Sequence, residues 1–346
     1  MAERSLQNSI KNKVLIVKPS SLGDIIHSLP FLYSVKEQMP EARVHWVIAE
    51  GLAPLLEGHP LIDRLWKINK DEWKKPSKAF QTIGQFRALS AKLRKEKFDA
   101  VFDLQGLLRS AIISRMAGAK AVVGFREARE GGNLFYTHKV SVSSLGKMHA
   151  PMHAVERYLK MAQFAGIEPR LGFPLPQDKD FVSPFRSGEY AVMAPGARWP
   201  SKRWPAPGWG ELARKFSPVP MVIVGAVSDA ALAGEIASCS GGAAIPFAGK
   251  SSLKGLVEII RGAKFMVTND SGPMHIAAAL EVPVFAVFGP TDPELTGPYG
   301  KGIRAVIKGQ AKCSPCRNRT CKDMSCMNAV SVEMVEREIR NLLPME

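Results

Sequence analysis

The chain alternates short apolar runs with helical patterns, and it does so twice. The expected strands lie at 14–17, 44–49, 100–104, 121–125, 190–194, 220–224, 243–247, 264–269 and 283–288. The expected helices lie at about 25–38, 84–97, 153–166, 208–216, 228–238, 252–262, 273–280 and 331–343. Short apolar strands between helices are typical of parallel sheets that helices cover on both faces. We therefore predict the α/β class, with doubly wound sheets.

A stretch with weak periodicity separates the two halves of this pattern. Residues 166–190 read "GIEPRLGFPLPQDKDFVSPFRSGEY" and carry the prolines and glycines of a linker. A chain of 346 residues is also long for a single core. We expect a first domain at 1–178, a second at 179–330, and a closing helix within 331–346.

The charge balance favours an anionic partner. Lys and Arg number 47 against 32 Asp and Glu, which gives a net charge of +15. Residues 67–97 hold ten of these cations and three acids. This segment is either a solvated helix face or a surface for anionic lipid head groups. It interleaves few aromatic residues, so we expect no nucleic-acid partner.

The N-terminal residues and the hydropathy indicate a cytoplasmic protein. The first dozen residues, "MAERSLQNSIKN", lack the apolar core of a secretory signal. No apolar run approaches the ~18 residues that cross a bilayer. The chain also lacks GxGxxG after its first strand and a P-loop, which disfavours a dehydrogenase or an NTPase.

The first loop places an acid between a strand and a helix. In "KVLIVKPSSLGDIIHSLP" (13–30), Asp24 follows the turn that ends the strand. Asp favours the N-cap of a helix, so capping is one interpretation. The other is that the carboxylate carries chemistry, as a general base would at the carboxyl end of a strand. The two roles are compatible.

A second strand-to-helix turn has the features of a diphosphate site. In "VTNDSGPMHIAAAL" (267–280), Asp270, Ser271 and Gly272 form the turn, and His275 follows in the first helical turns. Free N–H groups and the helix dipole attract anions at a helix N-terminus. A capped helix without ligand explains Ser271, but it does not explain an acid and a histidine at the same end.

Two further strand ends in the second half carry polar side chains. "APGARWPSKRWP" (194–205) contributes Arg198 and Lys202, which would neutralise a departing diphosphate or form a solvated basic loop. "VGAVSDAAL" (224–232) contributes Asp229, which would bond a ribose hydroxyl or cap its helix. In the first half, Arg126 and Arg129 of "GFREAREGG" suit carboxylate or phosphate groups, or are exposed loop residues.

Four cysteines lie close together near the C-terminus. "CSPCRNRTCKDMSC" places Cys313, Cys316, Cys321 and Cys326 in the spacing C-x2-C-x4-C-x4-C. In a cytoplasmic chain this spacing favours metal over disulfides, and a structural zinc site with four thiolates is one possibility. Reduced thiols and disulfides are the alternatives.

Several of these stretches together resemble glycosyltransferase family 9, the lipopolysaccharide heptosyltransferases. The resemblance covers nearly the whole chain and includes "KPSSLGDIIHSLP", "DLQGLLRSA", "HAVERYL", "NDSGPMHIAAAL" and "FGPTDPELTGPYG". The first loop is most like that of members that add the first heptose to Kdo. The resemblance implies a GT-B fold: two Rossmann-like domains facing a cleft, with the last helix returning to the first domain.

The resemblance also implies the reaction and its partners. The donor would be ADP-heptose, the acceptor Kdo–lipid A, and the location the cytoplasmic face of the inner membrane, peripherally bound. The transfer would invert the anomeric carbon and need no metal or other cofactor. A later heptosyltransferase acting on a heptosylated core, or a GT-B nucleotide-sugar hydrolase or epimerase, are the alternatives.

Family roles carry over to positions that match the motifs. Asp24 matches the catalytic acid and Lys202 a lysine that contacts the donor phosphates, so both are expected to be catalytic. The first domain would bind the acceptor through Ser21, Gly23, Arg126 and Arg129. The second would bind the donor through Ala197, Arg198, Lys202, Asp229, Asp270, Ser271, Gly272 and His275. The family often carries hydroxyl residues where Ala197 and Arg198 stand here, and the match at Asp229 is loose.

Overall fold

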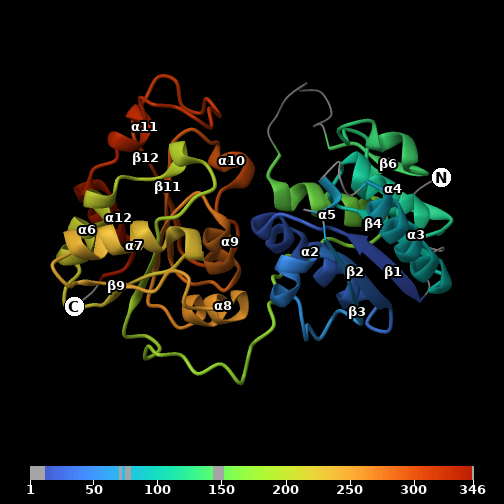
Figure 1. Cartoon of the computed structure of the whole chain (residues 1–346), viewed down its shortest axis with the longest axis horizontal. Helices are drawn as coiled ribbons and strands as arrows, with labels where there is room; N and C mark the ends of the chain where they lie inside the picture. The colour runs from blue at the N-terminus through green and yellow to red at the C-terminus, as the bar shows by residue number, and fades with distance from the viewer. Residues whose placement is uncertain (1–11, 70–71, 75–78, 143–151, 345–346) are drawn as a thin grey trace. The chain divides into compact units, whose positions relative to one another are not determined.

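The computed structural model describes residues 12–69, 72–74, 79–142 and 152–344. The chain divides into two compact units, residues 1–176 and 177–346. Within the described residues, each unit contains one six-stranded sheet whose paired strands are all parallel. Figure 1 shows helices lying around the strands of each unit. The predicted α/β class with doubly wound sheets is confirmed.

The first unit has the strand order β3-β2-β1-β4-β5-β6. Its strands are β1 (Lys13–Val17), β2 (Arg43–Ala49), β3 (Arg64–Ile68), β4 (Ala100–Asp103), β5 (Ala121–Phe125) and β6 (His138–Val140). Its α-helices are α2 (Leu22–Gln38), α3 (Ala79–Lys95), α4 (Leu108–Met116) and α5 (Ala154–Phe164). Short 3₁₀ turns are η1 (Glu50–Leu55), η2 (Glu72–Lys74) and η4 (Gly132–Phe135).

The second unit repeats this topology. The order β12-β11-β10-β7-β8-β9 is the first order read in the opposite direction. Its strands are β7 (Ala191–Ala194), β8 (Met221–Ile223), β9 (Ala244–Pro246), β10 (Met266–Asn269), β11 (Val284–Phe288) and β12 (Arg304–Lys308). Its helices are η5 (Pro200–Lys202), α6 (Ala206–Lys215), η6 (Val227–Asp229), α7 (Ala230–Cys239), α8 (Leu253–Arg261), α9 (Gly272–Ala279), α10 (Pro293–Thr296), α11 (Ser325–Asn328) and α12 (Val332–Leu342).

The central strands of the first sheet are buried on both faces, which explains the apolar runs of β1, β4 and β5. Leu15 and Val17 share a core with Leu93 of α3 and Ile113 of α4. On the other face, Phe102 of β4 contacts Phe31 of α2 with ring centroids 4.9 Å apart. Successive strand residues point to opposite faces, so a strand covered on both sides is apolar throughout.

The last helix, α12, packs within the second unit. Val332, Val335 and Ile339 belong to the core that Trp209 of α6 and Phe285 of β11 also form. Ser331 caps this helix by accepting a hydrogen bond from the Met334 amide. The return of this helix to the first unit stays a prediction.

Candidate active site

The predicted site residues follow the central strands of each sheet. The strand order reverses between β1 and β4 in the first unit, and between β7 and β10 in the second. Asp24 comes after β1, Lys202 after β7, and Asp270 directly after β10. Ligands of parallel α/β sheets bind at the carboxyl ends of strands, where the order reverses. Each of the three residues therefore follows a strand at the edge of its own sheet where ligands of this fold class bind.

Asp24 lies in the first turn of α2 and is held there by Ser21. The Ser21 amide and hydroxyl both donate to Oδ2 of Asp24, at 2.9 and 2.7 Å. Ser21 is the N-cap and Asp24 the third helical residue, so the expectation that Asp24 itself is the N-cap is wrong. Asp24 instead closes a capping box. Its side chain remains 40% exposed, so a fixed carboxylate faces solvent.

A buried lysine that the sequence reasoning missed lies beside Asp24. Lys18 is the first residue after β1, and Nζ lies 3.7 Å from Oδ1 of Asp24. Nζ also donates to the Leu104 carbonyl at 3.1 Å. The only signal in the sequence is a lysine placed directly after four apolar strand residues.

A second missed group, Asp103, supports the loops at this sheet edge. It ends β4 and is fully buried. Its carboxylate accepts from the Gln105 and Gly106 amides, at 2.9 and 3.0 Å, and from the Tyr136 hydroxyl at 2.8 Å. Burial raises the pKa of Asp103 despite these donors, and burial together with Asp103 raises the pKa of Tyr136. Asp103 therefore holds the loop after β4 in place.

A cavity of about 470 Å³ opens beside the Asp24 loop. It is lined by residues 21–22, 49–52 and 68–69, which lie at the carboxyl ends of β1, β2 and β3. Arg126 and Arg129 are exposed in the loop after β5, which lies on the other side of β1 in the sheet order. Ser21 therefore lines this cavity, whereas the two arginines do not. Gly23 is buried in the first turn of α2.

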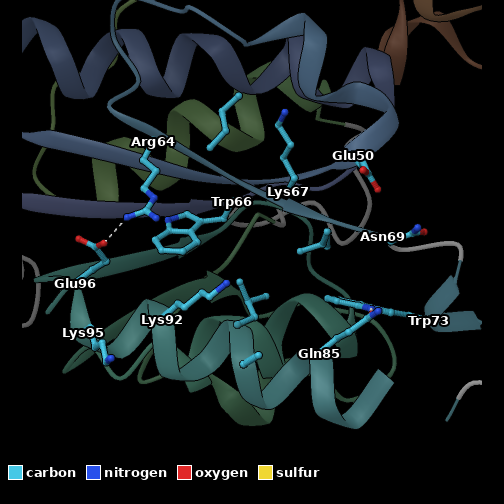
Figure 2. Close-up of a pocket in the computed structure, with 14 residues that line it drawn as sticks. Glu50, Arg64, Trp66, Lys67, Asn69, Trp73, Gln85, Lys92, Lys95 and Glu96 are labelled. Carbon is cyan, nitrogen blue, oxygen red and sulfur yellow. Dashed lines mark hydrogen bonds and ion pairs between the residues drawn. The ribbon is translucent and has the colours of Figure 1, made fainter. Parts of the chain in front are cut away.

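A larger cavity of about 760 Å³ lies between β3 and α3 and shares Glu50, Ile68 and Asn69 with the first. Figure 2 shows Arg64, Trp66 and Glu96 at one end. The Arg64 guanidinium lies 4.1 Å from the Trp66 ring and pairs with Glu96 at 2.9 Å. Trp73 and the exposed Lys92 and Lys95 also line this cavity.

In the second unit, Lys202 and Asp270 contact each other directly. Nζ of Lys202 lies 2.6 Å from Oδ2 of Asp270, and both side chains are largely buried, at 16% and 7% exposure. The Thr291 hydroxyl donates to the same Oδ2 at 2.6 Å. Nζ also lies 4.5 Å from the centroid of the Trp199 ring. Sequence reasoning did not single out Thr291 or Trp199.

Asn269 fixes the loop that carries Lys202. Its side-chain amide donates to the Pro195 carbonyl at 2.7 Å, and its Oδ1 accepts from the Trp204 amide at 3.2 Å. Asn269 is fully buried at the end of β10. The loop after β7 is thus tied to the strand that precedes Asp270, so the two predicted residues meet.

Helix α9 begins one residue earlier than expected, so Gly272 is helical, and the Ser271 side chain makes no capping hydrogen bond. Ser271 is the N-cap, Gly272 begins the helix, and a proline occupies the first turn. The Ser271 hydroxyl lies 3.3 Å from the Thr268 hydroxyl. His275 is 7% exposed. The α9 N-terminus therefore follows Asp270 at the carboxyl edge of the sheet.

The Asp229 side chain lies against Gly196, which follows β7, and Gly225, which follows β8. Its Oδ2 accepts from the Ala226 amide at 3.0 Å, and its Oδ1 lies 3.9 Å from the Arg203 guanidinium. A Cβ on Gly196 would come within 2.6 Å of Oδ2, so the close approach requires glycine. Arg203 also donates to the carbonyl of the buried Ala197 at 3.1 Å. Arg198 is exposed.

The cysteines do not form a recognisable metal site. Among the described residues, no group of three or more His, Cys, Asp or Glu side chains is arranged to hold a metal ion. Cys313 and Cys316 are exposed, whereas Cys326 is 5% exposed and packs in the core of the second unit. Burial, then Cys313 and Cys316, raises the pKa of the Cys326 thiol. The predicted zinc site is therefore not supported.

Searched over its described residues, the structure contains no helix with the length and apolarity to span a bilayer.

Comparison with known proteins identifies the family. The sequence profile of glycosyltransferase family 9 (heptosyltransferase) matches residues 86–326. Lipopolysaccharide heptosyltransferase 1 of Pseudomonas aeruginosa is 33% identical over 326 residues, which cover 89% of this chain and 87% of that protein.

Solved structures agree with this assignment. E. coli heptosyltransferase WaaC with ADP superposes with a TM-score of 0.76 at 27% identity, covering 95% of this chain and 99% of that one. The structure of WaaC with ADP-2-deoxy-2-fluoro heptose gives 0.76 at 28% identity, with the same coverage. The predicted GT-B fold class is confirmed. The chain belongs to glycosyltransferase family 9, the heptosyltransferases.

Proposed function

We propose that the protein is an inverting glycosyltransferase of lipopolysaccharide core synthesis. It would move L-glycero-D-manno-heptose from ADP-heptose to Kdo of the inner core. Family membership supports heptosyl transfer, and the relatives solved with ADP and with an ADP-heptose analogue support the donor class. The first unit would bind the acceptor and the second the donor.

The observation that carries the proposal is the fixed, exposed carboxylate of Asp24. An inverting transfer needs a base that takes the proton of the acceptor hydroxyl while its oxygen attacks the anomeric carbon. Asp24 is held by two bonds from Ser21, is 40% exposed, and adjoins the cavity that Ser21 lines. This cavity is our candidate for the acceptor sugar.

The leaving group needs positive charge as the bond between the anomeric carbon and the diphosphate breaks. Lys202 and the amide groups at the start of α9 supply it in our proposal. Asp270 and Thr291 would hold Lys202 and the turn in place. Asp229 would bond the ribose, and Ser271, Gly272, His275 and the backbone near Ala197 would complete the donor site. Arg198 is exposed, so its position gives the least support for a contact with the donor.

We further propose a peripheral location on the cytoplasmic face of the inner membrane. The basic excess supports this, because anionic head groups attract clustered Lys and Arg. Lys92 and Lys95 are exposed cations of the basic segment 67–97. Arg126 and Arg129 are exposed on the first unit and would meet the acceptor's carboxylate or phosphate groups.

The test is ADP release from ADP-heptose with Kdo–lipid A as acceptor, for the wild type and for Asp24→Asn. We expect release that depends on the acceptor, and a loss of about 10²–10⁴ in kcat for the variant with ADP affinity retained. Glu37→Gln, an exposed acid at the other end of α2, is the matched control and should keep full activity.

Other outcomes would replace the proposal. Release without acceptor would indicate a nucleotide-sugar hydrolase. Release that requires an already heptosylated core would indicate a later step of the same family. Normal kcat in Asp24→Asn would leave that residue only its structural role in the capping box.

A further inference from the structure

Lys18 is buried to a degree that lysines rarely reach. Its exposed fraction is 2%, and fully buried lysines are almost always paired. The ammonium group has fixed neighbours on three sides. It donates to the Leu104 carbonyl at 3.1 Å, lies 5.2 Å from the Tyr158 ring centroid, and lies 3.7 Å from Oδ1 of Asp24. A long, flexible side chain is thereby held in one position.

The surroundings keep this amine charged. Burial alone lowers the pKa of Lys18, but Asp24, Tyr158 and Asp103 raise it, and the net direction is upward. These groups face the ammonium from α2, α5 and β4 respectively. Asp103 is already engaged by two amides and the Tyr136 hydroxyl. Asp24 is therefore the partner of Lys18 that remains exposed enough to meet a substrate.

The two oxygens of Asp24 have different neighbours. The exposed Ser21 donates twice to Oδ2, while the buried Lys18 approaches Oδ1. We propose that Lys18 is a positioning residue for Asp24, fixing the carboxylate from beneath and keeping it ionised so that it can accept a proton. This inference rests on the proposed role of Asp24 as the base.

A purely structural role for Lys18 makes a different prediction. In that case the ammonium only joins the ends of β1 and β4 through Leu104, and its loss lowers stability without changing how activity depends on pH. If Lys18 acts on Asp24, removing the cation raises the pKa of the base, because a nearby positive charge favours the carboxylate. The acid limb of the kcat/KM profile then moves to higher pH.

The experiment compares wild type, Lys18→Met, Lys18→Arg and Asp24→Asn in the acceptor-dependent ADP-release assay across pH. Lys18→Met removes the charge and keeps most of the side-chain volume. We expect kcat to fall about 10- to 100-fold from loss of alignment, with the acid limb moved upward and ADP affinity unchanged. Lys120→Met, an exposed lysine of the same unit, is the control and should match the wild type.

Lys18→Arg keeps the charge, so its acid limb should remain at the wild-type pH even if its kcat falls. This variant decides the question if Lys18→Met fails to fold, as judged by ADP binding and thermal melting. An acid limb that moves equally in Lys18→Arg would overturn the inference. So would a Lys18→Met enzyme with the wild-type profile while Asp24→Asn is inactive. An active Asp24→Asn would instead refute the proposed base itself.

Discussion

Lys202, the last residue of η5 in the loop after β7, contacts Asp270, which directly follows β10, and its ammonium nitrogen lies 2.6 Å from Oδ2. Two loops that are 68 residues apart in the sequence are thereby joined at one sheet edge. Asp270 also accepts from Thr291, so the carboxylate has donors from two directions. This arrangement fixes the ammonium group before any anion arrives, and a preorganised charge costs little reorganisation when charge develops on a leaving group.

Replacing Lys202 should therefore impair both chemistry and donor binding. For Lys202→Met we expect kcat to fall by about 10²–10³ and the Kd for ADP to rise. Lys301→Met, which removes an exposed lysine of the same unit, should change neither quantity. Steady-state kinetics and calorimetric titration with ADP measure the two effects. Unchanged values for both would reduce Lys202 to an ion-pair partner of Asp270.

Gly196 allows Asp229 to approach the loop after β7, so adding one methyl group tests the proposed ribose contact. A Cβ at this position would meet Asp229 Oδ2 at 2.6 Å and force the carboxylate to move. A hydrogen bond to a charged group contributes about 1.5–3 kcal/mol, so Gly196→Ala should raise the Kd for ADP roughly 10- to 100-fold.

The matched control for that change is Gly234→Ala. Gly234 lies in α7 and has no heavy atom within 4 Å of an added Cβ. Alanine there should keep ADP affinity and stabilise the helix by about 0.5–1 kcal/mol. If Gly196→Ala binds ADP like the control, Asp229 does not contact the nucleotide.

The central strands could be predicted from the sequence because they are buried on both faces. Of the four edge strands, β3, β6 and β12 were missed, whereas β9 was predicted at 243–247. β12 alternates exposed Arg304, Val306 and Lys308 with buried Ala305 and Ile307, so it lacks a continuous apolar run. The nine-residue α4 was also missed, and its interior Ser110 and Ser114 bond back to carbonyls of the preceding turn.

The residues of the candidate site also divide into those that the sequence predicted and those that it did not. Asp24, Lys202 and Asp270 could be proposed from the sequence because each follows a strand within a local motif. Lys18 and Thr291 could not, since the contact that singles out each one forms only on folding: with Asp24 for Lys18, and with Asp270 for Thr291. A strand-end lysine looks the same in sequence whether it is buried or solvated. Sheet order brings Thr291, after β11, to Asp270, after β10. The turn between β1 and α2 brings Lys18 to Asp24.

His59 should make the stability of the first unit depend on pH. Its Nδ1 accepts from the Leu61 amide at 3.0 Å, and Nε2 lies 2.6 Å from the Pro174 carbonyl. These contacts require a neutral ring with its proton on Nε2. Burial lowers the pKa of His59 below 6.5, although the Pro174 carbonyl opposes this, and burial likewise lowers the pKa of His45.

Below about pH 6.5 the unfolded chain therefore binds protons that the folded chain excludes, so the free energy of unfolding falls as the pH falls. We expect Tm to decrease between about pH 7.5 and pH 5.5, and His59→Gln to weaken this dependence without abolishing it, because His45 contributes in the same direction. His138→Gln on β6 is the control and should retain the wild-type dependence. Thermal melts across this range measure the slope for each protein, and equal slopes for wild type and His59→Gln would show that His59 does not contribute.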